Sequence, residues 1–219
     1  TGENDAIGGY DEKAYRLQLL WEPSADFSAL LNVHGRELEG TASIFRANVF
    51  DKGSNELNAN YDRETVYYDG DLQGDGIDNN PQEYDGFGAS LKLEYDMDEV
   101  TFTSISALET ADGSSLGDVD GGFNLADGTS GPGFIPFSAV TQDNLDDLEQ
   151  YTQEFRLSSN SRDALNWQVG AFYYDASFNV TSIDGYFGAT TVFHDNQTWA
   201  VFGQTSYQVN EKLNVTGGI

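Results

Sequence analysis

The residues best suited to chemistry in this sequence are acidic, and they gather in one segment. Asp69, Asp71, Asp75 and Asp78 alternate with glycine and other residues in the stretch that ends at Asn80. Short oxygen ligands on a flexible loop are the kind of site that binds Ca²⁺. Their spacing differs from that of an EF-hand loop, and no glutamate stands at the twelfth position. Two interpretations stay open: a calcium site formed by these four aspartates, or an acidic loop that binds no metal.

Other catalytic chemistry has few candidates. The sequence contains only two histidines, His34 and His194, and no cysteine. No Gly-x-Ser-x-Gly, His-Glu-x-x-His or phosphate-loop pattern occurs. Metal sites need convergent partners at short spacing, so we expect each histidine to line a lumen or a rim. The sequence therefore predicts a protein that is not an enzyme and has no resident cofactor, the calcium possibility aside.

The charge of the chain excludes one class of partner. Ten basic residues against 37 acidic ones give a formal net charge of -27. Nucleic-acid binding requires clustered Lys and Arg, so it is not expected. Acidic segments such as 69–85 and 143–149 are expected between strands, where they would make one rim of a sheet strongly negative. This rim has two open explanations, solvation of the surface or attraction of cationic ligands.

Alternating segments dominate the rest of the sequence. Between Phe87 and Tyr95 an apolar or aromatic residue stands at every second position, which is typical of a half-buried strand. Four hairpins with very short turns follow from this pattern, and together they predict eight strands. The phase of the strand 197–207 is ambiguous, because Ala200 and Phe202 compete with Val201 and Tyr207 for the apolar face. The predicted hairpins cover residues 15–34, 87–108, 151–174 and 197–219.

The connections between hairpins are expected to be longer, at 35–86, 109–147 and 175–196. Short turns at one end of a sheet and long loops at the other are typical of outer-membrane barrels. No apolar run is long enough for a membrane-spanning helix. Aromatic residues near the short turns would form the periplasmic-side girdle of such a barrel, namely Trp21, Phe27, Tyr95, Phe102, Trp167 and Tyr207.

These features predict an all-β fold. We expect a partial antiparallel transmembrane β-barrel meander of about eight strands, with short periplasmic turns and long extracellular loops. Residues 1–219 would form one partial barrel domain, a piece of a larger barrel, because the last strand ends in mid-pattern. Alternation assigns Leu91, Leu93, Trp167, Val169 and Ala171 to a convex lipid side, and assigns to the concave side Lys92, Glu94, Glu154, Arg156, Asn166 and Gln168.

Five stretches resemble the barrel of TonB-dependent outer-membrane receptors. The strongest combines Thr-Gln-Glu-Phe-Arg-Leu at 152–157 with Trp-x-x-Gly-x-Phe-Tyr at 167–173. The others are Gln18–Phe27, Leu38–Asn48 and Trp199–Gln204. The resemblance implies active uptake of a scarce ligand, such as a ferric siderophore, cobalamin or an oligosaccharide, across a Gram-negative outer membrane. It also implies contact with outer-membrane lipid and lipopolysaccharide, and with the TonB complex through a plug domain that this sequence lacks.

Ligand contacts, if this part of the barrel makes them, are expected on the long loops, where aromatic rings supply area for sugars or siderophore rings. The candidates are Tyr67, Tyr68, Tyr84, Phe134 and Phe137. A competing interpretation is that these rings only hold the loops together. Other functions stay open for the whole chain: a secreted acidic β-sandwich or calcium-dependent adhesin, and, less favoured, a passive porin or a secreted hydrolase.

Overall fold

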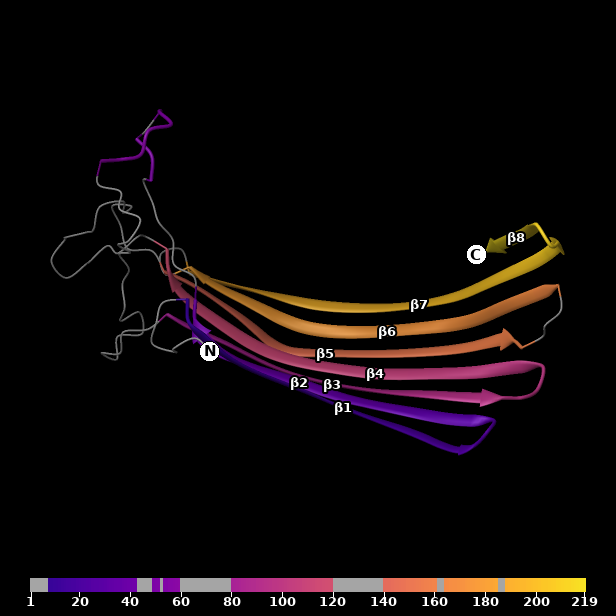
Figure 1. Ribbon diagram of the computed structural model, residues 1–219. Helices are drawn as coiled ribbons and strands as arrows, with labels where there is room; N and C mark the ends of the chain where they lie inside the picture. Colours follow the sequence, from indigo (N-terminus) through magenta and orange to yellow (C-terminus); the bar gives the residue numbers. More distant parts are fainter. Residues whose placement is uncertain are drawn as a thin grey trace.

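The computed structural model describes residues 8–42, 49–51, 53–59, 80–119, 140–160, 164–184 and 188–219. These residues form eight strands and no helix (Figure 1). The strands are β1 (Tyr10–Ser24), β2 (Phe27–Thr41), β3 (Pro81–Asp96), β4 (Val100–Asp118), β5 (Val140–Ser159), β6 (Leu165–Asp184), β7 (Gly188–Asn210) and β8 (Leu213–Gly218).

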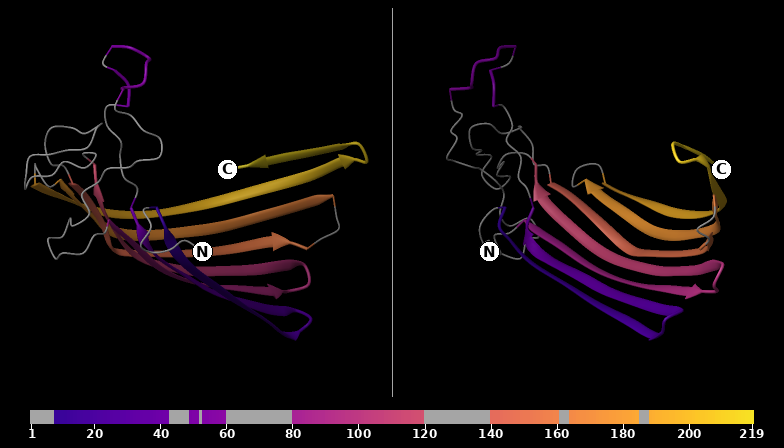
Figure 2. Two further views of the ribbon diagram at one scale, coloured as in Figure 1. Left: turned by 60° about the vertical axis from the view of Figure 1, so that its left-hand side comes forward. Right: turned by 45° about the vertical axis from the view of Figure 1, so that its right-hand side comes forward.

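All eight strands lie in one antiparallel sheet, and each pairs with its neighbours in chain order from β1 to β8. The sheet is a curved arc in both views of Figure 2. Within the described residues β1 and β8 each pair on one side only. The predicted all-β meander of eight antiparallel strands is therefore confirmed, and it has the open shape expected of part of a barrel wall.

Four short connections lie at one end of the sheet, which we call the turn end (right in Figure 1). One of them holds Asp98 at a φ of 63°, a left-handed conformation that aspartate tolerates better than most residues, and the Met97 amide donates to the Val100 carbonyl at 2.8 Å. The opposite end, the loop end, carries the connections 42–80 and 119–139. The third connection there is residues 185–187 alone, so the predicted loop 175–196 is wrong.

Strands continue well beyond the segments predicted from the sequence. β4 and β5 stay paired from Val100↔Ser159 to Asp118↔Val140, and β6 and β7 stay paired up to Asp184↔Gly188. The acidic segment 143–149 thus lies within β5 and not between strands. Backbone pairing needs no apolar side chain, so the ladder persists where the outer residues become acidic.

The register assigns every strand residue to one of two faces, because residues directly opposite each other point the same way. The outer face holds Leu91 in line with Leu31 and Ser106, and the inner face holds Lys92 in line with Leu30 and Ile105. All the facing assignments predicted from alternation agree with this register. It also settles the phase of β7: Val201 is opposite Ala171 on the outer face, and Phe202 is opposite Gly170 on the inner face.

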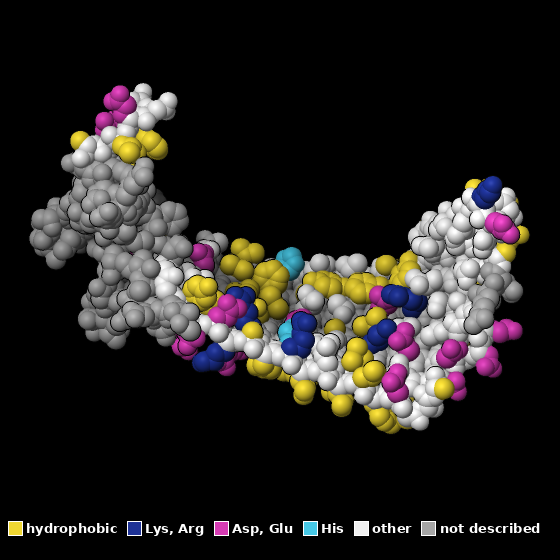
Figure 3. Space-filling view, in the orientation of Figure 1, with side chains coloured by type: hydrophobic (Ala, Val, Ile, Leu, Met, Phe, Trp, Pro, Cys, Tyr) yellow, Lys and Arg dark blue, Asp and Glu magenta, His cyan; other side chains and the backbone are white. Residues whose placement is uncertain are grey.

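Hydrophobic side chains project along the lower, convex outline of the sheet, and most of the visible Lys, Arg and His side chains lie inside the curve (Figure 3). Among the described residues the buried apolar side chains are only Ala42, Ala111, Leu116 and Ala176. A single sheet layer has no second layer to cover its apolar side. The outer face therefore presents its large apolar side chains to the surroundings.

Candidate functional site

The outer face carries an apolar band. Leu17, Leu19, Trp199 and Val201 are exposed by 65%, 60%, 75% and 71% of their surface. Monomeric soluble proteins rarely expose a contiguous apolar surface that crosses a whole sheet. We define the outer apolar band by apolar outer-face residues of β1, β2, β3, β5, β6 and β7: Leu17, Leu19, Leu31, Leu91, Leu93, Phe155, Leu157, Val169 and Val201.

Aromatic rings border this band at both ends. Toward the turn end Trp21 meets Phe27 edge to face at 5.9 Å between ring centroids, and Phe27 lies 6.4 Å from Tyr95. The six aromatics predicted for this border all occupy outer-face positions in the register. Toward the loop end a second border comprises Tyr15, Phe87, Tyr151, Tyr173 and Trp199. Two aromatic girdles around an apolar band are typical of a barrel wall in a bilayer.

Polar side chains of β4 and β5 interrupt the band, and the largest of them, Gln153, has its hydrogen bonds satisfied internally. Gln153 accepts from Ser106 Oγ at 2.5 Å and from Tyr151 Oη at 3.1 Å. Its amide nitrogen donates to Ser104 Oγ and to the Glu154 carbonyl, each at 3.1 Å. A polar side chain with all its donors and acceptors paired costs far less in an apolar environment than an unpaired one. The band can thus tolerate a glutamine.

Just beyond the loop-end border the outer face becomes polar. Tyr173 Oη donates to Asp175 Oδ2 at 2.6 Å, and Gln197 Nε2 donates to the same carboxylate at 3.1 Å. These two hydrogen bonds hold the pKa of the Asp175 carboxyl below its usual range. On β6 the outer face therefore changes from apolar at Val169 to polar at Asp175.

The inner face between the two borders is polar and carries paired charges. Lys92 Nζ lies 2.9 Å from Glu94 Oε2, and Arg156 pairs with Glu154. Both pairs join residues that stand two apart on one strand. The register places the pair on β3 beside the pair on β5, with β4 between them. Ile105 stands between Lys92 and Glu154 in one row, and Thr103 stands between Glu94 and Arg156 in the next. The charges alternate in sign, so this part of the inner wall is close to neutral.

A glycine makes a longer cross-strand pair possible. His34 on β2 and Glu109 on β4 are both aligned with Gly88 on β3, and His34 Nε2 lies 3.3 Å from Glu109 Oε2. A Cβ at Gly88 would overlap the Glu109 carboxylate, so the missing side chain is what allows the contact. His34 and His194 both occupy inner-face positions, which agrees with the lumen placement expected from the sequence.

The two faces exchange polarity at the loop end. The outer face here carries carboxylates, and several are directly opposite one another, as in Glu39↔Glu83 and Glu37↔Asp85↔Asp112. Like charges in direct register are destabilising. Among the described residues the outer carboxylates toward the loop end include Asp11, Glu37, Glu39, Glu83, Asp85, Asp112, Asp146, Glu149, Asp175 and Asp195.

The inner face at the loop end carries apolar and aromatic side chains together with a few polar ones, among them Glu12, Arg36 and Asp143. Phe178 and His194 are directly opposite each other on β6 and β7, and their rings stack with centroids 4.5 Å apart. Two adjacent rows of inner-face residues cross the strands here, and we call their apolar and aromatic members the inner loop-end surface. One row contains Leu38, Tyr84, Gly113, Leu145, Val180 and Val192, and the next contains Ala111, Leu148, Phe178 and His194.

Tyr84 is the one predicted ligand contact among the described residues, and it belongs to this surface. It lies on β3 and not on a loop, and its ring is half-buried. The Arg36 guanidinium carbon lies 5.5 Å from the centroid of the ring, and Arg36 Nε donates to Glu12 Oε1 at 2.7 Å. Stacking of a paired arginine fixes the ring while leaving one of its faces available.

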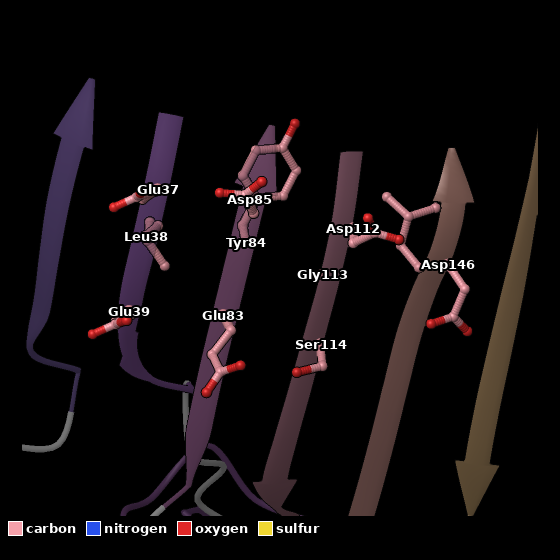
Figure 4. Close-up of a pocket in the computed structure, with 11 residues that line it drawn as sticks. Glu37, Leu38, Glu39, Glu83, Tyr84, Asp85, Asp112, Gly113, Ser114 and Asp146 are labelled. Atoms are coloured by element: carbon pink, nitrogen blue, oxygen red, sulfur yellow. The ribbon is translucent and has the colours of Figure 1, made fainter. Parts of the chain in front are cut away.

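A pocket of about 540 Å³ opens beside Tyr84 (Figure 4). Seven of its eleven lining residues occupy outer-face positions, namely Glu37, Glu39, Glu83, Asp85, Asp112, Ser114 and Asp146. The other four, Leu38, Tyr84, Gly113 and Leu145, stand between them along the strands. The pocket is therefore bordered mainly by the carboxylates of the outer face.

The remaining predicted site residues lie outside the described residues. They are the aromatics Tyr67, Tyr68, Phe134 and Phe137 and the aspartates Asp69, Asp71, Asp75 and Asp78. In the part of the chain that the structure does describe, no three His, Asp or Glu side chains converge in a way that could hold a metal ion. The calcium interpretation therefore stays a prediction.

Sequence reasoning missed Phe178 and His194 because it assigned residues 175–196 to a loop. The signal was present in the spacing of Phe178 with Val180 and of Val192 with His194, which alternate as strand residues do.

The fold and the distribution of side chains define a class of protein. A curved antiparallel meander with an apolar outer band, two aromatic borders and a polar inner face is the wall of an outer-membrane type of barrel. Within the described residues no helix has the length and apolar character needed to cross a membrane.

Comparison with known proteins agrees at the level of the fold. No family profile matches the sequence, and no curated protein sequence matches it. The structure is similar to the crystal structure of the ferric yersiniabactin uptake receptor FyuA from Yersinia pestis, with a TM-score of 0.68 and 14% identity. The match covers 97% of this chain and 29% of the receptor chain. This chain thus has the fold of part of an outer-membrane receptor barrel, and it spans less than a third of the length of that receptor.

Proposed function

We propose that this chain forms part of the wall of a TonB-dependent outer-membrane receptor that takes up a scarce ligand into a Gram-negative bacterium. The ligand would be a ferric siderophore, cobalamin or an oligosaccharide. The observation that carries the proposal is the outer apolar band with its two aromatic borders, combined with a structural similarity to an uptake receptor.

The width of the band supports a place in a bilayer. On β3 the borders are Phe87 and Tyr95, eight residue steps apart. At about 3.3 Å per step this is roughly 26 Å along the strand, and a tilt of about 40° reduces it to about 20 Å across a membrane. Outer-membrane barrels have an apolar band of about 25 Å. The two lengths agree within one residue step or two.

The two faces suggest different partners. The outer face would contact outer-membrane lipid and lipopolysaccharide, and the neutral inner wall of paired charges would meet a plug domain that connects the receptor to the TonB complex. Tyr84 and the loop aromatics Tyr67, Tyr68, Phe134 and Phe137 would contact the ligand. Ca²⁺ bound by Asp69, Asp71, Asp75 and Asp78 would have a structural role. The described residues form one sheet, so no observation favours the alternative of a face-packed β-sandwich or adhesin.

Uptake by cells tests the proposal. Strains with and without the complete gene would receive a ⁵⁵Fe-loaded siderophore, ⁵⁷Co-cobalamin or a labelled oligosaccharide, each with and without a protonophore. We expect the accumulation of one ligand class to depend on both the gene and the proton gradient. Accumulation that needs the gene but persists with the protonophore would indicate a passive porin. No dependence on the gene for any ligand would contradict an uptake function.

A further inference from the structure

A small groove opens on the outer face of β3 and β4, within the apolar band. Its volume is about 150 Å³. Six of its lining residues occupy outer-face positions in two neighbouring rows, and Ser90 and Ala107 stand between these rows along the strands. We call it the outer groove, and its six outer-face residues are Leu31, Leu91 and Ser106 in one row and Ala89, Leu108 and Tyr151 in the other.

Two small side chains create the outer groove. In each row a large residue stands directly opposite a small one, because Ala89 is opposite Leu108 and Leu91 is opposite Ser106. The two small residues are diagonal neighbours across the strands, so they leave a gap between the two leucines. The backbone of the residues between the rows forms the floor of this gap, since their side chains point to the inner face.

The lining of the outer groove is apolar although it contains two outer-face hydroxyls. Ser106 Oγ donates to Gln153 Oε1 at 2.5 Å, and Tyr151 Oη donates to the same oxygen at 3.1 Å. Gln153 itself is not one of the lining residues. Both hydroxyl protons are thus directed to a group outside the groove. An apolar cavity of about this volume stays free of water and accommodates a molecule of the size of benzene.

The outer groove lies in the half of the band that faces the loop end. Leu91 is at the centre of the band on β3, and Tyr151 belongs to the loop-end border. From Leu91 to the border residue Phe87 there are four residue steps, which is about 13 Å along the strand and about 10 Å across a membrane at a tilt of about 40°. Half of a hydrocarbon core is about 15 Å thick. The groove therefore lies at the depth of the acyl chains of one leaflet, the leaflet on the loop-end side.

The size of the outer groove favours a lipid chain over a protein partner. Eight residues line it. A stable protein interface involves about 20 to 30 residues on each side. The volume of the groove corresponds instead to about six carbon atoms, which is a part of one acyl chain. The groove is also continuous with the apolar band, where a bilayer supplies such chains.

We propose that the outer groove binds part of one acyl chain of a lipid from the leaflet on the loop-end side, and that it retains this lipid longer than the flat parts of the band retain theirs. This inference rests on the proposed function, because it requires the outer apolar band to lie in a bilayer. A chain in the groove contacts the floor and the flanking leucines at once, so each of its carbon atoms has more neighbours than on a flat wall.

Photolabelling from the lipid phase tests the proposal. The complete protein would be inserted into phosphatidylcholine vesicles that contain a small fraction of phosphatidylcholine with a diazirine on one acyl chain. After illumination, mass spectrometry would locate the label. We expect at least about fivefold more label on Leu91 and Leu108 than on Leu17 and Leu157, which occupy outer-face positions of the band outside the groove. Comparison of leucines with leucines removes differences in side-chain reactivity.

Filling the outer groove should abolish this excess. Ala89→Leu places a larger apolar side chain in the gap and keeps the outer face apolar, so the label on Leu108 should fall to the level of Leu17. Ala171→Leu is the matched control, since Ala171 is exposed on the outer face of β6 and does not line the groove. It should leave the excess unchanged. Ala89→Val fills less of the gap, and it gives the same comparison with a smaller change of volume if Ala89→Leu folds poorly.

The outcomes separate this proposal from the proposed function. Equal label on all four leucines, or an excess that survives both substitutions of Ala89, would overturn the lipid site and leave a lipid-facing band standing. Weak label on Leu91 and Leu108, together with cross-links between two copies of the protein, would show that a second copy covers the groove and would also overturn the lipid site. No label on any of the four leucines would contradict the bilayer placement on which the proposed function rests.

Discussion

An arginine placed in the middle of the outer apolar band should destabilise the protein strongly. Leu91 lies on β3 four residues from Phe87 and four from Tyr95, at the centre of the band, between Leu31 and Ser106. A lipid-facing arginine at the midplane costs about 2 to 4 kcal/mol. Because about 1.4 kcal/mol is a factor of ten, Leu91→Arg should lower the folding equilibrium constant by roughly 30- to 1,000-fold.

Ser90→Arg is the matched control, because Ser90 is the preceding residue and faces the inner side beside Ala107. We expect it to cost less than about 1 kcal/mol, as for a polar substitution away from a packed site. Both variants of the complete protein would be unfolded by urea in lipid vesicles, with folding followed by heat-modifiable gel migration. If Ser90→Arg were the more damaging of the two, the assignment of faces would be refuted.

Two further substitutions test local features. Gln153→Leu should cost about 1 to 3 kcal/mol, because it leaves the hydroxyls of Ser104, Ser106 and Tyr151 without a partner in the apolar band; a stability unchanged in vesicles would show that the hydrogen bonds do not form. Gly170→Ala should cost about 1 to 3 kcal/mol, since its Cβ would overlap the Phe202 ring. The control Gly203→Ala meets its nearest atoms at 3.6 Å and should be tolerated, so equal losses in the two would argue against this packing.

The parts of the fold that could be predicted from the sequence are those in which the outer residues are apolar. Between Phe87 and Tyr95 alternation reflects burial of one face in an apolar medium, and it gave the correct strand, face and turn. Beyond the loop-end border the apolar residues move to the inner face and acids occupy the outer one. The acidic part of β5, residues 143–149, therefore resembles a loop in the sequence although it is a strand.

The candidate site was harder to predict for the same reason. The sequence predicts Tyr84 as a loop aromatic, but it lies on a strand, in one row with residues far away in the sequence. Leu145 and Val180 join its row only because a bulge, with Asp147 at a φ of 55°, shifts the pairing of β5 between Asp146 and Glu149. A bulge of this kind leaves no reliable mark in a single sequence, so the row can be seen only in the structure.

Cysteine labelling at two adjacent positions tests the central claim most directly. Val169 is on the outer face and 46% exposed, and Gln168 is opposite Gln204 on the inner face. Val169→Cys and Gln168→Cys would be introduced separately into the complete protein in native membranes and exposed to a lipid-soluble maleimide. A wall that faces lipid with its apolar band predicts labelling from the lipid phase at Val169→Cys and not at Gln168→Cys. Labelling at Gln168→Cys without labelling at Val169→Cys would contradict the account.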